Sequence, residues 1–182
     1  KRHKTVLLAD GSEEFRWLVW KCAGEHTYFS MKRGDKRLFD SGWDILRCVQ
    51  EQPPDLLLID TALPDICGLT VLKELARRGS VPKTIVISSV VSERMAAKAL
   101  SLGAVYFLPK PFHIEALFDL IYGLLHGYPQ YPPLALSRAA GNGCLFEKAL
   151  LRKANDRNSF FGIMKRRPSR KWEGLRFLCY LS

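Results

Sequence analysis

The sequence feature that most constrains the fold is the run Leu56-Leu57-Leu58-Ile59-Asp60, in which four consecutive apolar residues end in a carboxylate. An uninterrupted apolar run of this length predicts a strand buried on both faces, as strands are in a parallel sheet. Ligands bind to open parallel sheets at the carboxyl ends of the strands, so Asp60 stands where chemistry is expected. Pro64 and Gly68 then indicate a loop before the next helix. Taken alone, an Asp at the end of a strand is weak evidence for chemistry, because many such residues cap the following helix.

Similar apolar runs recur along the chain and alternate with helical patterns. Further strands are predicted at 5–9, 84–87 and 104–108, and helices at about 12–24, 43–52, 69–79, 92–103 and 114–125. The second strand in chain order is ambiguous, because residues 26–31 and the pair Leu38-Phe39 are both candidates. Short strands that alternate with helices predict a doubly wound α/β fold with a parallel sheet.

Polar residues follow the predicted strands at the point where each strand ends. Asp10 and Asp60 follow the first and third strands, Ser88 and Ser89 follow the fourth, and Lys110 comes soon after the fifth. The carboxyl ends of parallel strands meet at one edge of a sheet, so these side chains are expected to converge on one crevice. We expect Ser89 to pack rather than to bind a ligand.

The spacing of these residues resembles a known family. The matching residues are Ala9-Asp10, Asp60 with Pro64 and Gly68, Ser88, and Phe107-Leu108-Pro109-Lys110-Pro111-Phe112. Over about residues 4–126 the chain resembles the CheY-like receiver domain of two-component response regulators, and residues 99–112 are most similar to the sporulation stage 0 regulators. The resemblance implies a flavodoxin-like, five-stranded parallel sheet of order 2-1-3-4-5 and a receiver domain over residues 1–126.

The resemblance also implies a phosphorylation site. Asp60 would be the phosphoacceptor, because a carboxylate can attack phosphorus and hold an acyl phosphate. Asp10, Asp60 and the Ala62 backbone carbonyl would bind Mg²⁺, which offsets the repulsion between an anionic nucleophile and an anionic donor. Lys110 would supply a mobile positive charge to the phosphoryl oxygens.

A switch would accompany the chemistry. By resemblance, Ser88 would bind the attached phosphoryl group through its hydroxyl, and Phe107 would change position when it does. The Lys110-Pro111 bond would be cis, as X–Pro bonds can be. The implied partners are a sensor histidine kinase or phosphotransfer protein and a receiver homodimer, and the implied role is in transcription regulation.

One departure leaves a second interpretation open. The family usually has two adjacent acids after the first strand, whereas here the second position is Gly11, which is expected to weaken Mg²⁺ binding. The alternative is a degenerate receiver that binds proteins independently of phosphate. An enzyme such as an Asp-nucleophile phosphatase is not expected, because it needs an acid two residues after the nucleophile and this chain has Ala62 there.

The positive charge is concentrated after the receiver-like region. Residues 127–182 hold 11 Lys and Arg against 3 Asp and Glu, whereas residues 1–126 hold 17 against 15. We expect a Pro-rich linker followed by a basic, poorly ordered tail, either a shortened output region or an altered end. Such a tail suits phosphate contacts with DNA.

The remaining features indicate a cytoplasmic protein. No apolar run approaches the roughly 20 residues that span a bilayer, and the apolar start is too short for a signal-peptide core. The five cysteines are odd in number and widely spaced, which predicts free thiols rather than a zinc site or a disulfide framework. No membrane partner is expected.

Overall fold

The computed structural model describes residues 4–24, 29–30, 38–90 and 92–126. Its strands are β1 (Lys4–Ala9), β2 (Phe29–Ser30), β3 (Leu38–Phe39), β4 (Leu56–Asp60), β5 (Thr84–Ser88) and β6 (Tyr106–Pro109). Its helices are α1 (Glu13–Ala23), α2 (Gly42–Glu51), α3 (Gly68–Arg77), α4 (Glu93–Ser101) and α5 (Ile114–His126). The predicted linker and tail, 127–182, lie outside the described residues.

The strands form one parallel sheet in the order β2-β1-β4-β5-β6, and β3 also pairs with β1. Strand β2 pairs near the start of β1, through Lys4 and Phe29, whereas β3 pairs near its end, through Leu8 and Leu38. The expectation that only one of the two segments is the second strand was therefore wrong, because each pairs with a different half of β1. With that position shared by two short strands, the predicted order 2-1-3-4-5 is confirmed.

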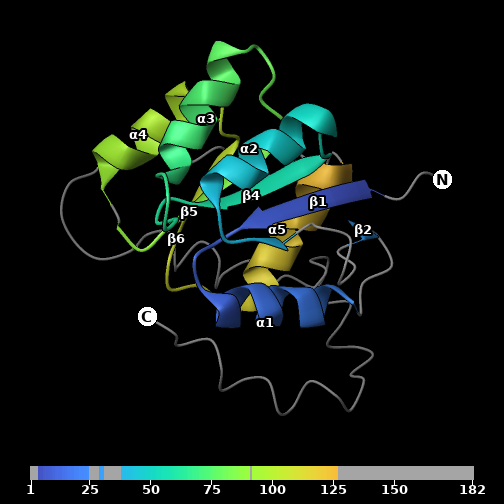
Figure 1. The fold of residues 1–182 in the computed structure, drawn as a ribbon. Helices are drawn as coiled ribbons and strands as arrows, with labels where there is room; N and C mark the ends of the chain where they lie inside the picture. Colours follow the sequence, from blue (N-terminus) through green and yellow to red (C-terminus); the bar gives the residue numbers. More distant parts are fainter. Residues whose placement is uncertain (1–3, 25–28, 31–37, 91, 127–182) are drawn as a thin grey trace, which may run out of the picture.

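Successive residues of each central strand enter two separate hydrophobic cores. On β4, Leu56 and Leu58 pack in the core with α1 and α5, whereas Leu57 and Ile59 pack in the core with α2, α3 and α4. Figure 1 shows the corresponding layers, with α1 and α5 on one side of the sheet and the other three helices opposite. Side chains alternate between the two faces of a strand, so an unbroken apolar run is what a sheet covered on both faces requires.

Close backbone packing holds α3 against the end of β4. A Cβ atom on Gly68 would lie 2.1 Å from the backbone oxygen of Asp60, which no side chain allows. The Gly68 amide donates a hydrogen bond to the Thr61 carbonyl at 3.1 Å. Gly68 is therefore needed for a close approach that fixes the loop between β4 and α3 directly after Asp60.

Two further sequence expectations can be compared with the described part of the chain. Its three cysteines, Cys22, Cys48 and Cys67, form no disulfide bonds with one another. None of the helices described is both long enough and apolar enough to cross a bilayer.

Candidate functional site

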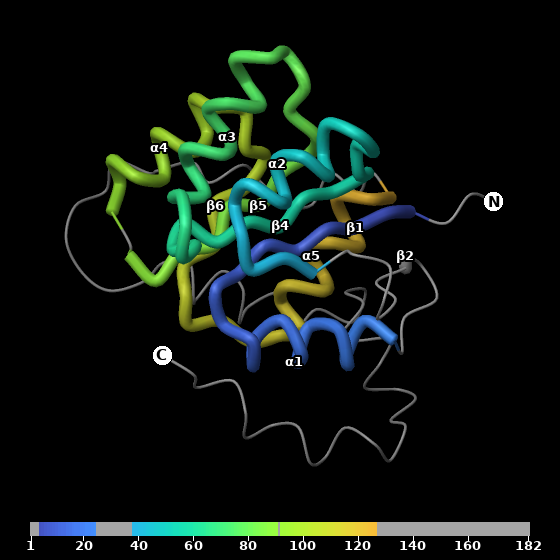
Figure 2. The backbone as a smooth tube through the Cα atoms, in the orientation of Figure 1, coloured from blue at the N-terminus to red at the C-terminus, as the bar shows by residue number. Residues whose placement is uncertain are grey.

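The polar residues predicted at the strand ends meet at one edge of the sheet. Figure 2 shows the connections after β1, β4 and β6 at this edge. Asp10, Asp60 and Ser88 are almost completely buried there, with exposed fractions of 1%, 3% and 0%. Buried polar groups are retained in a fold when they are hydrogen-bonded, and each of these three is.

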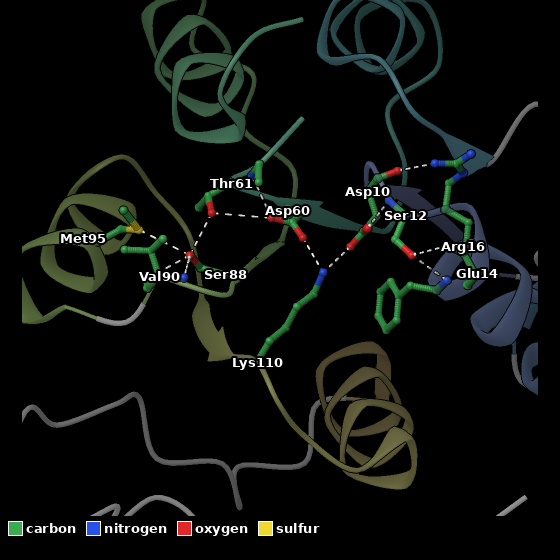
Figure 3. A network of polar contacts seen from close by, with 12 residues as sticks. Asp10, Ser12, Glu14, Arg16, Asp60, Thr61, Ser88, Val90, Met95 and Lys110 are labelled. Atoms are coloured by element: carbon green, nitrogen blue, oxygen red, sulfur yellow. Dashed lines mark hydrogen bonds and ion pairs between the residues drawn. The ribbon is translucent and has the colours of Figure 1, made fainter. Parts of the chain in front are cut away.

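Lys110 lies between the two carboxylates (Figure 3). Its Nζ donates a hydrogen bond to Asp10 Oδ2 at 2.8 Å and a second, short hydrogen bond to Asp60 Oδ2. The same ammonium lies 4.8 Å from the centre of the Phe15 ring, whose face attracts a cation. The site therefore holds one positive charge shared by two acids that come from different strands.

The surroundings of these groups shift their pKa values. Burial raises the pKa of Asp10, and the hydrogen bonds from Lys110 and from the Ser12 amide oppose that rise only in part. Burial alone would lower the pKa of Lys110, but its hydrogen bonds to Asp10 and Asp60 outweigh burial and raise it. Lys110 is therefore held firmly in its charged form.

The second oxygen of each carboxylate accepts a backbone hydrogen bond. Asp10 Oδ1 accepts from the Ser12 amide at 2.8 Å, and Asp60 Oδ1 accepts from the Ala62 amide at 2.7 Å. The guanidinium of Arg16 donates to the Asp10 backbone carbonyl. Each acid is thus oriented by fixed backbone donors on one oxygen and by a lysine on the other.

A pair of hydroxyl groups lies beside the charged residues, on the α4 side of the sheet. Thr61 Oγ1 lies 2.8 Å from Ser88 Oγ and 3.5 Å from Asp60 Oδ1. Ser88 Oγ also accepts from the Val90 amide at 3.1 Å and lies 2.9 Å from the Val90 carbonyl and 3.4 Å from Met95 Sδ. The hydroxyl of Ser88 thus points toward the connection between β5 and α4.

Strand register explains why Thr61 meets Ser88. Asp60 is paired with Ile87, so the residues that follow them in the chain, Thr61 and Ser88, lie opposite each other. The Thr61 amide extends the ladder by donating to the Ile87 carbonyl at 2.9 Å. Sequence reasoning missed Thr61, because matching the ends of the two apolar runs would place Asp60 opposite Ser88, whereas the observed register is shifted by one residue.

The remaining predicted residues are also at or near this edge. Phe107 is buried in the core under α2, α3 and α4. The Lys110-Pro111 bond is cis, as expected. Ser89 is exposed, so the expectation that it is a packing residue was wrong, because β5 ends at Ser88 and Ser89 already lies in the connection that follows.

The oxygen donors suit a hard divalent cation but are few. Asp10 and Asp60 supply carboxylates, and the Ala62 carbonyl lies beside the turn after β1, 3.0 Å from where a Cβ on Gly11 would stand. Among the described residues, no group of three His, Cys, Asp or Glu side chains is arranged to hold a metal ion. Mg²⁺ commonly uses one or two carboxylates together with water and phosphate oxygens, so this donor set fits it.

Sequence reasoning also missed Asp65, whose carboxylate holds the loop after Asp60 in place. Asp65 accepts from the hydroxyl of Ser41 at 2.7 Å, and from the amides of Gly42 at 2.7 Å and Trp43 at 3.1 Å. It also accepts from the Ile66 amide at 2.8 Å. Burial tends to raise the pKa of Asp65, but these hydrogen bonds outweigh it and hold the pKa well below 3.8. Asp65 therefore caps the first turn of α2 from another loop.

Comparison with known families agrees with this geometry. The family described as "Response regulator receiver domain" matches residues 7–122. The DNA-binding transcriptional regulator NtrC of Proteus hauseri is 28% identical over 116 residues, which are 64% of this chain and 23% of that protein. The chain thus spans about a quarter of the length of this curated relative.

Solved structures share the fold. The signal receiver domain of a LuxO repressor protein from Vibrio parahaemolyticus superposes with a TM-score of 0.62 at 22% identity, covering 69% of this chain and 92% of that one. A LuxR-family DNA-binding response regulator from Staphylococcus aureus gives a TM-score of 0.60 at 20% identity, covering 67% and 98%. At these identities the likeness shows a common fold.

Proposed function

The chain belongs to the family of response regulator receiver domains, and we propose that it is a phosphorylation-controlled switch whose acceptor is Asp60. Receiver domains of two-component systems are generally signalling modules rather than enzymes. They interact with histidine kinases or phosphotransfer proteins, and they generally bind Mg²⁺ at the phosphorylation site. The specific roles below are proposals for this chain.

The observation that carries the proposal is the lysine shared by two buried acids. In the transfer, a carboxylate oxygen of Asp60 forms a bond to phosphorus while the bond from phosphorus to the donor breaks, leaving an acyl phosphate and the released donor group. Lys110 already contacts Asp60 and can turn to the phosphoryl oxygens on its flexible stem. Asp10 keeps Lys110 charged and close by.

We propose that Asp10, Asp60 and the Ala62 carbonyl hold Mg²⁺ when it binds. The ion would neutralise charge on the acceptor and on the incoming phosphate. Gly11 adds no carboxylate to this set, so we expect the affinity to be weaker than in a site with a third acid.

We further propose that the switch passes from Asp60 to Ser88 and Phe107 and changes the partner of the β5–α4–β6 face. A sensor histidine kinase or phosphotransfer protein would be the donor, and a second receiver a candidate partner for that face. Because NtrC and the LuxR-family regulator are described as DNA-binding, we propose that the switch acts in transcription regulation.

The direct test is formation of the acyl phosphate. The protein is incubated with acetyl phosphate or phosphoramidate and Mg²⁺, and its intact mass is measured beside that of Asp60→Asn. A mass gain of one phosphoryl group in wild type that is absent from the variant supports the proposal. No gain in a folded wild type overturns it.

A phosphate-independent interaction module is the second candidate, and Gly11 is the observation that favours it. The test restores the usual acid with Gly11→Asp. Its Cβ would lie 3.0 Å from the Ala62 carbonyl, so the loop must move by a few tenths of an ångström, and Gly11→Ala controls for that strain. A large gain in phosphorylation for Gly11→Asp alone shows that the natural site is impaired. A measurable wild-type rate that is unchanged in Gly11→Asp shows that the site works with two acids.

For residues 127–182 we propose a basic segment that contacts DNA, separate from the receiver domain of residues 1–126. Its excess of positive charge supports phosphate contacts, which give affinity without sequence choice. DNA affinity should fall steeply with salt and vanish in a chain truncated after Gly127. Affinity that survives truncation would assign DNA binding to the receiver domain instead.

A further inference from the structure

We propose that Thr61 is a positioning residue whose hydroxyl couples the charge of Asp60 to the hydrogen bonding of Ser88, and through Ser88 to Val90 in the connection between β5 and α4. The inference rests on the proposed function in taking Asp60 as the group whose charge changes. Its test uses the unphosphorylated protein, so the two can fail separately.

Three side-chain oxygen atoms and a backbone carbonyl form a continuous line across the end of the sheet (Figure 3). Asp60 Oδ1 is 3.5 Å from Thr61 Oγ1, which is 2.8 Å from Ser88 Oγ, which is 2.9 Å from the Val90 carbonyl. Thr61 is 8% exposed and Ser88 is completely buried, so water does not compete freely for these groups. Thr61 is thus the side chain that lies between the acceptor and Ser88.

The two hydroxyl groups have two hydrogens between them, which limits the arrangements. In the outward arrangement Thr61 donates to Ser88 and Ser88 donates to the Val90 carbonyl. In the inward arrangement Ser88 donates to Thr61 and Thr61 donates to Asp60. A hydroxyl has one hydrogen to donate, so the Val90 carbonyl loses its donor when Asp60 gains one.

The distances favour the outward arrangement in the unphosphorylated structure. Its two contacts, at 2.8 and 2.9 Å, are ordinary for hydroxyl donors, whereas the 3.5 Å contact with Asp60 is long. Lys110 and the Ala62 amide already bind the carboxylate of Asp60, so it has little need of Thr61. A change in charge or acceptor strength at Asp60 shifts the balance between the two arrangements.

The line ends at a residue that faces solvent. Val90 is 62% exposed, whereas the polar groups that lead to it are buried. The Val90 amide donates to Ser88 Oγ at 3.1 Å and its carbonyl lies 2.9 Å from the same oxygen. A reorientation of the Ser88 hydroxyl therefore changes both backbone hydrogen bonds of a surface residue.

Replacing Thr61 by valine would break this line without leaving a buried polar group unpaired. Valine has a similar shape and no hydroxyl, and Ser88 would keep its contacts with the Val90 amide and carbonyl. Thr61→Ser keeps the hydroxyl and removes a methyl group. The pair of variants therefore separates hydrogen bonding from packing.

The experiment measures how the Val90 amide responds to a change at Asp60. Backbone ¹H–¹⁵N spectra are recorded for wild type, Thr61→Val and Thr61→Ser, each with and without Asp60→Asn, on the full chain and without a phosphoryl donor. The Ala62 amide, which donates directly to Asp60, is the internal control. It should respond to Asp60→Asn in all three backgrounds.

We expect the Val90 response, taken relative to that of Ala62, to be about threefold smaller in the Thr61→Val background than in wild type and to be retained in the Thr61→Ser background. An equal Val90 response in wild type and Thr61→Val would overturn the proposal, as would a loss in Thr61→Ser that matches the loss in Thr61→Val. If Thr61→Val does not fold, Thr61→Ala takes its place with the same expectation. Intact mass after acetyl phosphate treatment then tests the acceptor role of Asp60 independently.

Discussion

Asp60 is the last residue of β4 and Asp65 lies five residues later in the following loop, yet the protein binds their two carboxylates in different ways. Asp60 is buried, and one of its oxygens depends on the ammonium of Lys110. Asp65 is exposed and is bound by one hydroxyl and three backbone amides. One carboxylate has a partner that can move, and the other has partners that are fixed by the fold.

The difference indicates what each acid is for. A lysine on a four-carbon stem can follow a group that changes charge, which supports the acceptor role that we propose for Asp60. Backbone amides at a helix start cannot follow, so Asp65 is suited to hold the loop in one position. Because the loop also carries Ala62, fixing it at Asp65 keeps the Ala62 amide aimed at Asp60. Substitutions at each acid's partners should separate these two roles.

The largest effect is expected from Lys110→Met, which leaves Asp10 and Asp60 buried without their cation. Breaking a buried pair in this way should lower the free energy of unfolding by about 3 kcal/mol. Urea unfolding at pH 7 measures it. Lys4→Met is the matched control, because Lys4 bonds Asp55 at 3.0 Å from a partly exposed position at the other end of the sheet. The free energy of unfolding of that variant should fall by only about 0.5 kcal/mol. Equal decreases in the two variants would contradict the larger contribution that we expect from Lys110.

A smaller effect is expected from Asp65→Ala, which removes the acceptor shared by Ser41, Gly42 and Trp43. Loss of this cap should cost about 2 kcal/mol in urea unfolding at pH 7. Asp44→Ala, on the same helix, is the control and should cost about 0.5 kcal/mol. Since the hydrogen bonds lower the pKa of Asp65, its contribution is present above pH 3.8 and is lost as the pH falls toward the folded-state pKa. A difference that persists unchanged at pH 2 would rule out this explanation.

The smallest effect is expected at Asp119 on α5, an acid whose pKa is raised to about 6 by burial and by the negative charge of Glu115. Here the folded state binds the proton more tightly than the unfolded state, whose pKa is 3.8. Stability should therefore fall as the pH rises from 3.8 to 6. Asp119→Asn should be about 1 kcal/mol more stable than wild type at pH 7, after allowance for partial exposure. The two proteins should be equally stable at pH 4, and a constant difference would show that charge is not the cause.

Much of the fold followed from the sequence because its strands are unbroken apolar runs. Such a run specifies burial on both faces, and its first polar residue marks the functional edge, as at Asp60 and Ser88. The two strands that pair with β1 on its outer side could not be predicted in this way, because the segments at Phe29 and Leu38 are too short to show an apolar pattern. The contacts of Thr61 and Asp65 were missed for a different reason. They depend on strand register and on contact between two loops, which local periodicity does not report.

The position of Lys110 in the chain also determines when its contacts with Asp10 and Asp60 can form during synthesis and folding. Lys110 is 100 residues from Asp10 and 50 from Asp60 along the chain. A chain still being synthesised, with residue 110 not yet outside the ribosome, holds both acids and lacks their cation. Contacts between residues so far apart in sequence also form late in folding, after most of the entropy of loop closure has been lost. The three charged groups can therefore come together only after almost the whole described domain, up to residue 110, has been synthesised.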